Sequence, residues 1–224
     1  EVLLADTQVH FCGMPVALVI ANTDAAAKAA VKKIKMEVES LEIITDPRVA
    51  KEKGELIIPP RTFQLGDTVR AWKNCDYIFE GRTETNGQEH LYIETQGAYV
   101  LPQENGALKV FSSTQGPTAV QRTIAGVLGI AMNKVEVDTT RLGGGFGGKE
   151  DQATAWAVLC ALAAYDLKRP VKYSLHRMED MRMTGKRHAY SSDFKLGLLK
   201  NGRILAYEVT FYQNGGAATD LSPG

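Results

Sequence analysis

Five glycines occupy the six consecutive positions from Gly143 to Gly148, interrupted only by Phe146. Glycine loses more backbone entropy on folding than any other residue, so this density indicates unusual dihedral angles or a close approach of the backbone to another group. The loop follows a strand-like segment, Val135–Asp138, and precedes a predicted helix whose N-terminus offers free N–H groups. Residues 141–150, called the glycine loop below, therefore predict either an anion-binding loop or a structural turn between strand and helix.

Gly143, Gly145 and Gly148 satisfy the G-x-G-x-x-G pattern of dinucleotide-binding proteins, in the expected strand–loop–helix setting. That pattern also needs an acidic residue at the end of the following strand. The following strand ends at Leu175–Arg177, and the acidic residues Glu179 and Asp180 lie only beyond it. A dinucleotide site therefore stays open at this stage as a weak alternative.

Gly143–Lys149 also matches the first seven positions of the phosphate-binding P-loop. The next position of that motif is a Ser or Thr whose hydroxyl meets magnesium, and here it is Glu150. A carboxylate at this place repels phosphates, so the sequence excludes a nucleotide triphosphatase.

The first part of the chain predicts a strand–helix–strand unit. An apolar run of strand length, Met14–Ala21, precedes a helix over Asp24–Lys35, and Met36–Glu39 begins a second strand. A linker is expected around Asp46–Phe63, where Pro and charged residues replace apolar ones. The predicted domain boundary lies there, between residues 1–56 and 57–224.

The second part predicts two hairpins and two amphipathic helices, so the fold class is α+β. Asn-Gly pairs at Asn105 and Asn201 separate strand-like runs, which is a strong hairpin signal. Apolar residues recur at helical spacing from Val120 to Leu128 and from Ala155 to Ala163. The other predicted strands are Tyr77–Phe79, Leu91–Glu94, Val135–Asp138 and Val171–Leu175.

Charge and cysteine content exclude several classes of protein. The 26 basic residues balance 26 acidic ones, which argues against nucleic-acid binding. The three cysteines are widely separated, so we expect neither a disulfide framework nor a zinc or iron–sulfur site, and a reducing, cytoplasmic compartment is favoured. The longest apolar stretch, residues 153–165, is too short to span a bilayer, and no membrane association is expected.

Gln115 lies in a second strand-to-helix turn, Phe111–Pro117, and its amide can donate and accept hydrogen bonds at once. Taken alone, it is a neighbour of a helix cap. Together with the glycine loop, it resembles the molybdopterin-binding part of the xanthine dehydrogenase and aldehyde oxidase family. The segments that carry this resemblance are Ser113–Gln115, Arg141–Glu150, Gly87–Thr95, Arg177–Met181, Thr184–His188 and, for the end of the family's hammerhead domain, Gly13–Ala17.

The resemblance implies the end of an α/β hammerhead domain over residues 1–56, followed by the first part of a mixed-sheet molybdopterin-binding domain over residues 57–224. It implies a molybdenum–pterin cofactor whose metal takes no side chain of this chain as a ligand. Gln115, Phe146 and Gly147 are then the cofactor-binding residues. Glu150 corresponds to the position where xanthine-type enzymes contact a purine. Glu94, like its neighbours, is interpreted as a structural strand residue.

By the same resemblance, the expected reaction is hydroxylation of a purine such as xanthine or hypoxanthine with oxygen derived from water. Iron–sulfur clusters and FAD are expected on other domains or subunits, and the full enzyme is expected to be an oligomer. The catalytic glutamate is expected beyond Gly224, so the chain is interpreted as a fragment that is inactive alone. Two alternatives remain: an aldehyde or N-heterocycle oxidoreductase of the same family, and a non-catalytic scaffold or assembly module.

Overall fold

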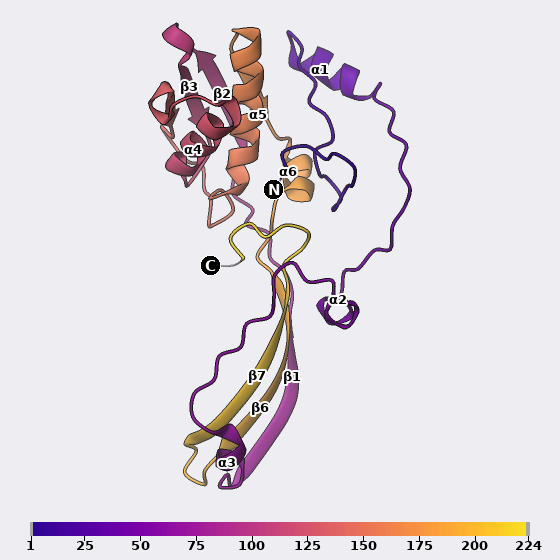
Figure 1. Cartoon of the computed structure of the whole chain (residues 1–224), viewed down its shortest axis with the longest axis vertical. Helices are drawn as coiled ribbons and strands as arrows, with labels where there is room; N and C mark the ends of the chain where they lie inside the picture. The colour runs from indigo at the N-terminus through magenta and orange to yellow at the C-terminus, as the bar shows by residue number, and fades with distance from the viewer. Residues whose placement is uncertain (1, 223–224) are drawn as a thin grey trace. The chain divides into compact units, whose positions relative to one another are not determined.

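The computed structural model describes residues 2–222, which combine helices with mixed β-sheet (Figure 1). They form two compact units. The first, residues 2–40 and 89–186, contains the glycine loop and is called the loop unit. The second, residues 41–88 and 187–222, contains the longest strands and is called the strand unit.

The sheet of the loop unit has the strand order β4-β3-β2-β5 and is mixed. The β2–β3 hairpin is antiparallel and confirms the first Asn-Gly prediction, whereas β3 and β4 are parallel and are joined through α4. The elements of this unit are α1 (Asp24–Val31), β2 (Gly97–Pro102), β3 (Leu108–Ser112), α4 (Pro117–Leu128), β4 (Val135–Asp138), α5 (Gln152–Leu167), β5 (Val171–Ser174) and α6 (Arg177–Met183), with short 3-10 turns at Glu104–Gly106 and Met132–Lys134.

Helices α4 and α5 pack against each other and cover one face of this sheet, as Figure 1 shows. The small residues Ala157, Ala161 and Ala164 let α5 lie close to the strands, and all three are buried. Val120 and Ile124 of α4 join them in the same core. Both helices agree with the sequence prediction, and together they fix the two loops that follow β3 and β4.

The strand unit is a three-stranded antiparallel sheet in the order β1-β6-β7 (Figure 1). Its strands are β1 (Tyr77–Thr85), β6 (Ala189–Leu198) and β7 (Ile204–Asn214). The β6–β7 hairpin confirms the second Asn-Gly prediction, and Gly202 adopts a φ of 82°, which suits glycine. Its helices are α2 (Pro47–Lys53) and α3 (Thr68–Trp72).

The strand–helix–strand prediction for the first part of the chain is wrong in its strands. Neither Met14–Ala21 nor Met36–Glu39 forms a strand in the described residues, because neither pairs with a neighbour that could satisfy its backbone. Leu18 instead packs on a small cluster around Trp156. The predicted helix is present but ends at Val31.

Two further predictions are corrected. Leu91–Glu94 is not a strand, because Leu91 takes a left-handed φ of 47°. The expected linker Asp46–Phe63 contains helix α2, whose first N–H groups are capped by the Asp46 carboxylate. Proline at the start and Gly54 in a left-handed cap at the end explain why so short a segment is helical.

Within residues 2–222, every helix is too short or too polar to cross a bilayer.

Candidate functional site

The glycine loop and the turn that carries Gln115 meet at one edge of the loop unit's sheet. Each follows one of the two parallel strands, the first β4 and the second β3, and the carboxyl ends of parallel strands are where α/β sheets bind ligands. The backbone N–H of Gln115 donates to the carbonyl oxygen of Lys149 at 2.8 Å. The structure thus brings the two loops singled out by the sequence into direct contact.

The amide of Gln115 is held in one orientation by the glycine loop. Its Oε1 accepts hydrogen bonds from the N–H groups of Gly147 and Lys149, at 3.1 and 3.2 Å. These two donors require that the oxygen face the loop, so the amide nitrogen Nε2 faces elsewhere. Within residues 2–222 this Nε2 has no recorded partner, and the Gln115 side chain is exposed. The site therefore presents a fixed, available hydrogen-bond donor.

Three of the five glycines are required by contacts inside the protein. A Cβ at Gly145 would lie 2.3 Å from Oε1 of Gln115, and one at Gly143 would lie 2.4 Å from Cβ of Glu94. A Cβ at Gly148 would lie 2.7 Å from Nδ1 of His90. Much of the glycine density thus comes from close packing of the loop on its own support.

Gly147 is different, because a Cβ there would meet no atom of the protein within 4 Å. Its φ is 87°, and the preceding Phe146 also has a positive φ, 54°, with 74% of its surface exposed. No described residue accepts a hydrogen bond from the N–H of Phe146. The tip of the loop thus leaves open space beside free backbone donors, which suits an anionic, oxygen-rich ligand.

Lys149 supports the loop from inside, and its side chain is fully buried. Its Nζ donates to the Ser113 hydroxyl at 2.6 Å, to the Glu94 carbonyl at 2.7 Å and to the Glu94 carboxylate at 3.2 Å. Burial lowers the pKa of Lys149, although Glu94 opposes that shift. A P-loop lysine has to reach phosphates, whereas this ammonium group has acceptors within the fold for all three of its protons.

Glu94 receives hydrogen bonds from three residues at once, two of them in the glycine loop. Its carboxylate accepts from the Gly143 N–H at 2.9 Å and from the Ser113 hydroxyl at 2.7 Å, besides Lys149. Burial alone would raise the pKa of Glu94, but these donors outweigh it and hold the pKa below its usual value. Glu94 is structural, as expected, yet it lies in a loop and not in a strand.

A second buried network holds the other end of the loop. The Asp180 carboxylate accepts from the Tyr92 hydroxyl at 2.8 Å and from the Gln96 N–H at 2.7 Å. Gln96 then donates through Nε2 to the carbonyl of Gly148 at 2.9 Å. Burial, with the hydrogen bond to Asp180, raises the pKa of Tyr92 to about 12. The glycine loop is therefore fixed to the core at both ends.

Sequence reasoning found the two loops but missed this support. Nothing in the sequence distinguishes a buried lysine from a solvated one at Lys149. Asp180 belongs to the Arg177–Met181 segment that carries the resemblance, but nothing in the sequence indicates that its carboxylate is buried or what it binds. The contacts of Tyr92, Gln96 and Asp180 join residues more than eighty positions apart, so no local pattern reports them.

Glu150 lies at the edge of the site. It stands two residues before α5, which begins at Gln152, and its side chain is exposed. None of the described residues pairs with its carboxylate. Its carbonyl carbon and oxygen contact the place that a Cβ of Gly116 would occupy, 3.2 Å from the oxygen. Glu150 is thus close to the Gln115 turn and free to contact a ligand.

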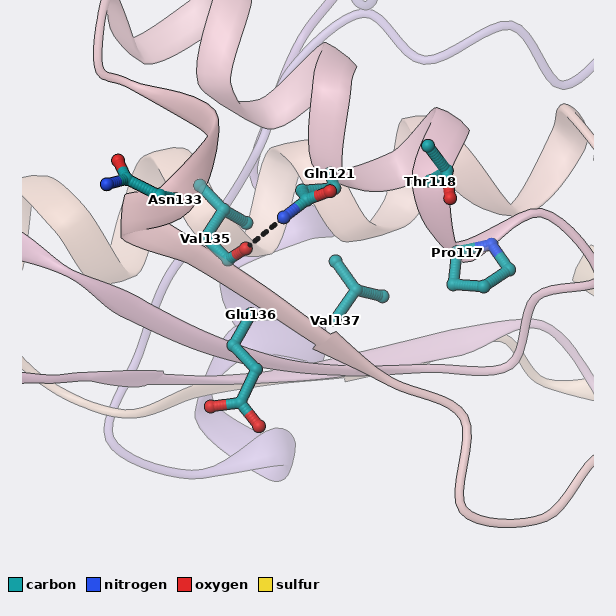
Figure 2. A pocket seen from close by; sticks show the side chains of 7 residues that line it. All are labelled: Pro117, Thr118, Gln121, Asn133, Val135, Glu136 and Val137. Carbon is teal, nitrogen blue, oxygen red and sulfur yellow. Dashed lines mark hydrogen bonds between the residues drawn. The ribbon is translucent and has the colours of Figure 1, made fainter.

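A separate hollow of about 540 Å³ lies between α4 and β4 (Figure 2). Gln121 crosses one side of it and donates to the carbonyl of Val135 at 2.7 Å, the dashed line in Figure 2. Its lining contains neither Gln115 nor any residue of the glycine loop; the residues that line it are Pro117, Thr118, Gln121, Asn133, Val135, Glu136 and Val137. The open space at Gly147 is therefore a different site.

Residues 49–224 match the family model of the molybdopterin cofactor-binding domain. The chain is 39% identical to xanthine dehydrogenase of Emericella nidulans over 99% of its own length and 16% of the relative's. It is 40% identical to aldehyde oxidase 1 of Oryctolagus cuniculus over 99% of its own length and 17% of that relative's. The chain thus spans about one sixth of the curated relatives that it matches.

Solved structures show the same fold. CO dehydrogenase from Oligotropha carboxidovorans superposes with a TM-score of 0.83 at 23% identity, over 94% of this chain and 29% of that one. Aldehyde oxidoreductase from Desulfovibrio gigas superposes with a TM-score of 0.82 at 27% identity, over 93% of this chain and 24% of that one. The α+β class expected from the sequence is confirmed by these superpositions and by the mixed sheet.

Proposed function

The chain belongs to the family of molybdopterin cofactor-binding domains that xanthine dehydrogenases and aldehyde oxidases contain, and from this premise we propose that it forms one wall of the cofactor site in a larger molybdenum hydroxylase. When bound, a molybdenum–pterin cofactor supplies the chemistry that hydroxylates a carbon with oxygen from water. The protein's part is to bind and orient that cofactor and its substrate.

We assign cofactor contacts to Gln115, Phe146 and Gly147. The observation that carries this assignment is the locked amide of Gln115, whose Oε1 takes two loop N–H groups while Nε2 has no partner in the described residues. The open space at Gly147 lies beside it, and the Phe146 N–H is available there. Preorganised donors of this kind stabilise oxygen ligands that gain negative charge.

A purine is the substrate class that we propose, with Glu150 as its contact. In support, its carboxylate is exposed, lies near the Gln115 turn and pairs with no described residue. A carboxylate can accept hydrogen bonds from ring N–H groups and, when protonated, can donate to a ring nitrogen. An aldehyde or another N-heterocycle is the alternative, since aldehyde oxidases are as similar to this chain as xanthine dehydrogenases are.

The remaining parts of the proposed holoenzyme follow from the same family. Iron–sulfur and FAD domains or subunits accept the electrons, the complete enzyme is an oligomer, and it works in the cytoplasm. Residues 1–56 form the end of a hammerhead domain, and residues 57–224 form the first part of the molybdopterin-binding domain. We place the catalytic base on a part of the enzyme outside these 224 residues.

Replacing Gly147 with alanine in the proposed holoenzyme tests the cofactor site. The new methyl group enters the open space and meets no protein atom within 4 Å, so apart from the backbone strain of a positive φ it displaces only a ligand in that space. We expect molybdenum and pterin content to fall at least about tenfold, measured per purified protein by elemental analysis and pterin fluorescence.

Gly66→Ala is the matched control, because Gly66 also has a positive φ, 72°, and open space around its Cβ position. It carries the same kind of backbone strain but lies in the strand unit. We expect it to leave cofactor content unchanged. Full cofactor content in Gly147→Ala would contradict the proposed site.

A further inference from the structure

Burying the charged side chain of Lys149 costs free energy. A lysine with no exposed side-chain surface has lost the hydration of its charge, and such groups persist only when hydrogen-bonded partners replace the water. Here the replacements are the Glu94 carboxylate, the Glu94 carbonyl and the Ser113 hydroxyl, with the Tyr92 ring centre 4.4 Å from Nζ. The ammonium group is therefore bound on several sides by the support of the glycine loop.

The backbone of the same residue holds Gln115. The Lys149 N–H donates to Gln115 Oε1 at 3.2 Å, and the Lys149 carbonyl accepts from the Gln115 N–H at 2.8 Å. The Thr114 hydroxyl donates to that carbonyl as well, at 3.2 Å. Lys149 thus connects its own buried ammonium group, paired with Glu94, to the exposed Gln115 amide, which its main chain holds.

Glu94 completes the connection from the opposite side. Its carboxylate accepts the Gly143 N–H at the start of the glycine loop while pairing with the lysine at the end of the loop. The loop is therefore closed across its base by one ion pair. Movement of either partner would shift the Gly147 and Lys149 N–H groups that orient the Gln115 amide.

We propose that Lys149 and Glu94 are positioning residues: the ion pair between the buried ammonium group and the partly exposed carboxylate fixes the Gln115 amide so that its Nε2 donor faces the cofactor. This inference rests on the proposed function only for the identity of the group that Nε2 meets. Within residues 2–222 the pair bonds to the Ser113 hydroxyl, the Glu94 carbonyl and the Gly143 N–H, so we assign it a role that acts through the loop.

Nuclear magnetic resonance of the ¹⁵N-labelled 224-residue chain tests the proposal without any cofactor. The readouts are hydrogen exchange of the Gly147 and Lys149 amides, and the Nε2 signal of Gln115. In Lys149→Met we expect both amides to exchange at least about tenfold faster and the Gln115 signal to move toward that of a mobile glutamine. Glu94→Gln should act in the same direction with a smaller change.

Lys109→Met is the control, because Lys109 also forms ion pairs in the same unit, with Glu136 and Asp138, and none of these three residues belongs to the glycine loop. We expect it to leave the Gln115 signal unchanged. If Lys149→Met does not fold, Glu94→Gln and Ser113→Ala decide the question. Folded variants with unchanged amide exchange and an unchanged Gln115 signal would overturn the proposal.

The proposed holoenzyme gives a second readout. Lys149→Met should lower kcat about tenfold or more with little change in KM, since misplacing a group that orients a metal's ligands costs rate. The two ideas can fail separately. If the amides respond but Gly147→Ala keeps its molybdenum, the positioning role stands and the proposed cofactor site is wrong.

Discussion

The loop unit has fully buried charged side chains, whereas every described charged side chain of the strand unit is at least partly exposed. Lys149, Asp180 and Gln96 are all fully buried in the loop unit. In the strand unit, every residue of β1 is exposed, and Arg48 holds α2 to the sheet through a two-pronged contact with Asp193. In the loop unit, buried polar contacts hold one loop in place. In the strand unit, the backbone is held by the hydrogen bonds between long paired strands.

This difference shows what a binding loop needs. A backbone with several glycines has many accessible conformations. The hydrogen bonds that Glu94, Lys149 and Gln96 make with or within the glycine loop stabilise one of them. A β-ribbon needs no such selection, because its ladder fixes the backbone already. The two tryptophans allow the units to be followed separately, since Trp156 lies in the loop unit and Trp72 in the strand unit.

Of the substitutions that test this comparison, Asp180→Ala should lower the stability of its unit the most. The substitution leaves the Tyr92 hydroxyl and the Gln96 N–H buried without their acceptor. We expect the free energy of unfolding of the loop unit to fall by about 3 kcal/mol. Urea unfolding followed by Trp156 fluorescence, in a Trp72→Phe background, measures it.

Asp193→Ala is the matched change in the strand unit, where the carboxylate is 43% exposed. Because water can replace the lost partner of Arg48, we expect a clearly smaller shift of the unfolding midpoint, followed by Trp72 fluorescence. Equal losses in the two units would show that the buried network gives the loop no special support.

Gly143→Ala should destabilise the loop unit less than the loss of Asp180. Its methyl group would lie 2.4 Å from Cβ of Glu94 and force the loop away from its support. We expect a loss of about 1 to 3 kcal/mol, measured by the same unfolding experiment. Gly126→Ala in α4 is the control, since its methyl group meets nothing within 4 Å and helix propensity favours alanine. A neutral Gly143→Ala would contradict the close packing.

Alkaline pH should distinguish the units without mutation. Burial raises the pKa of Tyr92, Tyr173 and Cys160, all in the loop unit, to about 12. In the unfolded chain the thiol has its ordinary pKa of 9.0 and the phenols have theirs of 10.0, so these groups ionise there at a lower pH than in the folded unit. Stability of the loop unit is therefore complete below about pH 9 and is lost progressively as the pH rises toward 12.

The half-exposed Tyr77 and Tyr207 of the strand unit give a contrast. We expect the midpoint reported by Trp156 to fall between pH 9 and 11 by more than the midpoint reported by Trp72. A parallel decline in both units would show that the burial of these phenols and this thiol has little effect on stability.

Glu150→Val should have the smallest effect, confined to substrate preference. Loss of a charged hydrogen-bond partner lowers kcat/KM for xanthine by about tenfold or more, while an aromatic aldehyde loses little. The measurement is the ratio of kcat/KM for the two substrates in the proposed holoenzyme. An unchanged ratio would mean that Glu150 does not contact substrate, and the aldehyde alternative would then be favoured.

Local sequence patterns predicted the parts of the fold that depend on neighbours in the chain. The Asn-Gly hairpins and the helices α4 and α5 are confirmed, because turn chemistry and helical spacing are local properties. Helix α4 is amphipathic as predicted, whereas α5 is buried on most of its sides. Met14–Ala21 failed as a strand because an apolar run becomes a strand only when another strand pairs with it. The resemblance supplied Gln115 and Phe146, and their roles stay predictions.

The support of the site could not be predicted, because it depends on distant contacts. Glycine density predicted either the approach of a ligand or a structural turn, and Gly143, Gly145 and Gly148 fit the second, because they pack on Glu94, Gln115 and His90. Only Gly147 keeps the open space that the first explanation required. The burial of Lys149 likewise follows from its contacts with two distant segments, at Glu94 and Ser113, and not from its neighbours in the chain.

Replacing Gln115 with alanine in the proposed holoenzyme tests the central claim most directly. The substitution removes the fixed Nε2 donor, and the Gly147 and Lys149 N–H groups lose their acceptor. With molybdenum content measured on the same sample, we predict a fall in the rate of the chemical step on the order of a hundredfold or more, with substrate affinity little changed. Unchanged turnover at normal molybdenum content would contradict the account.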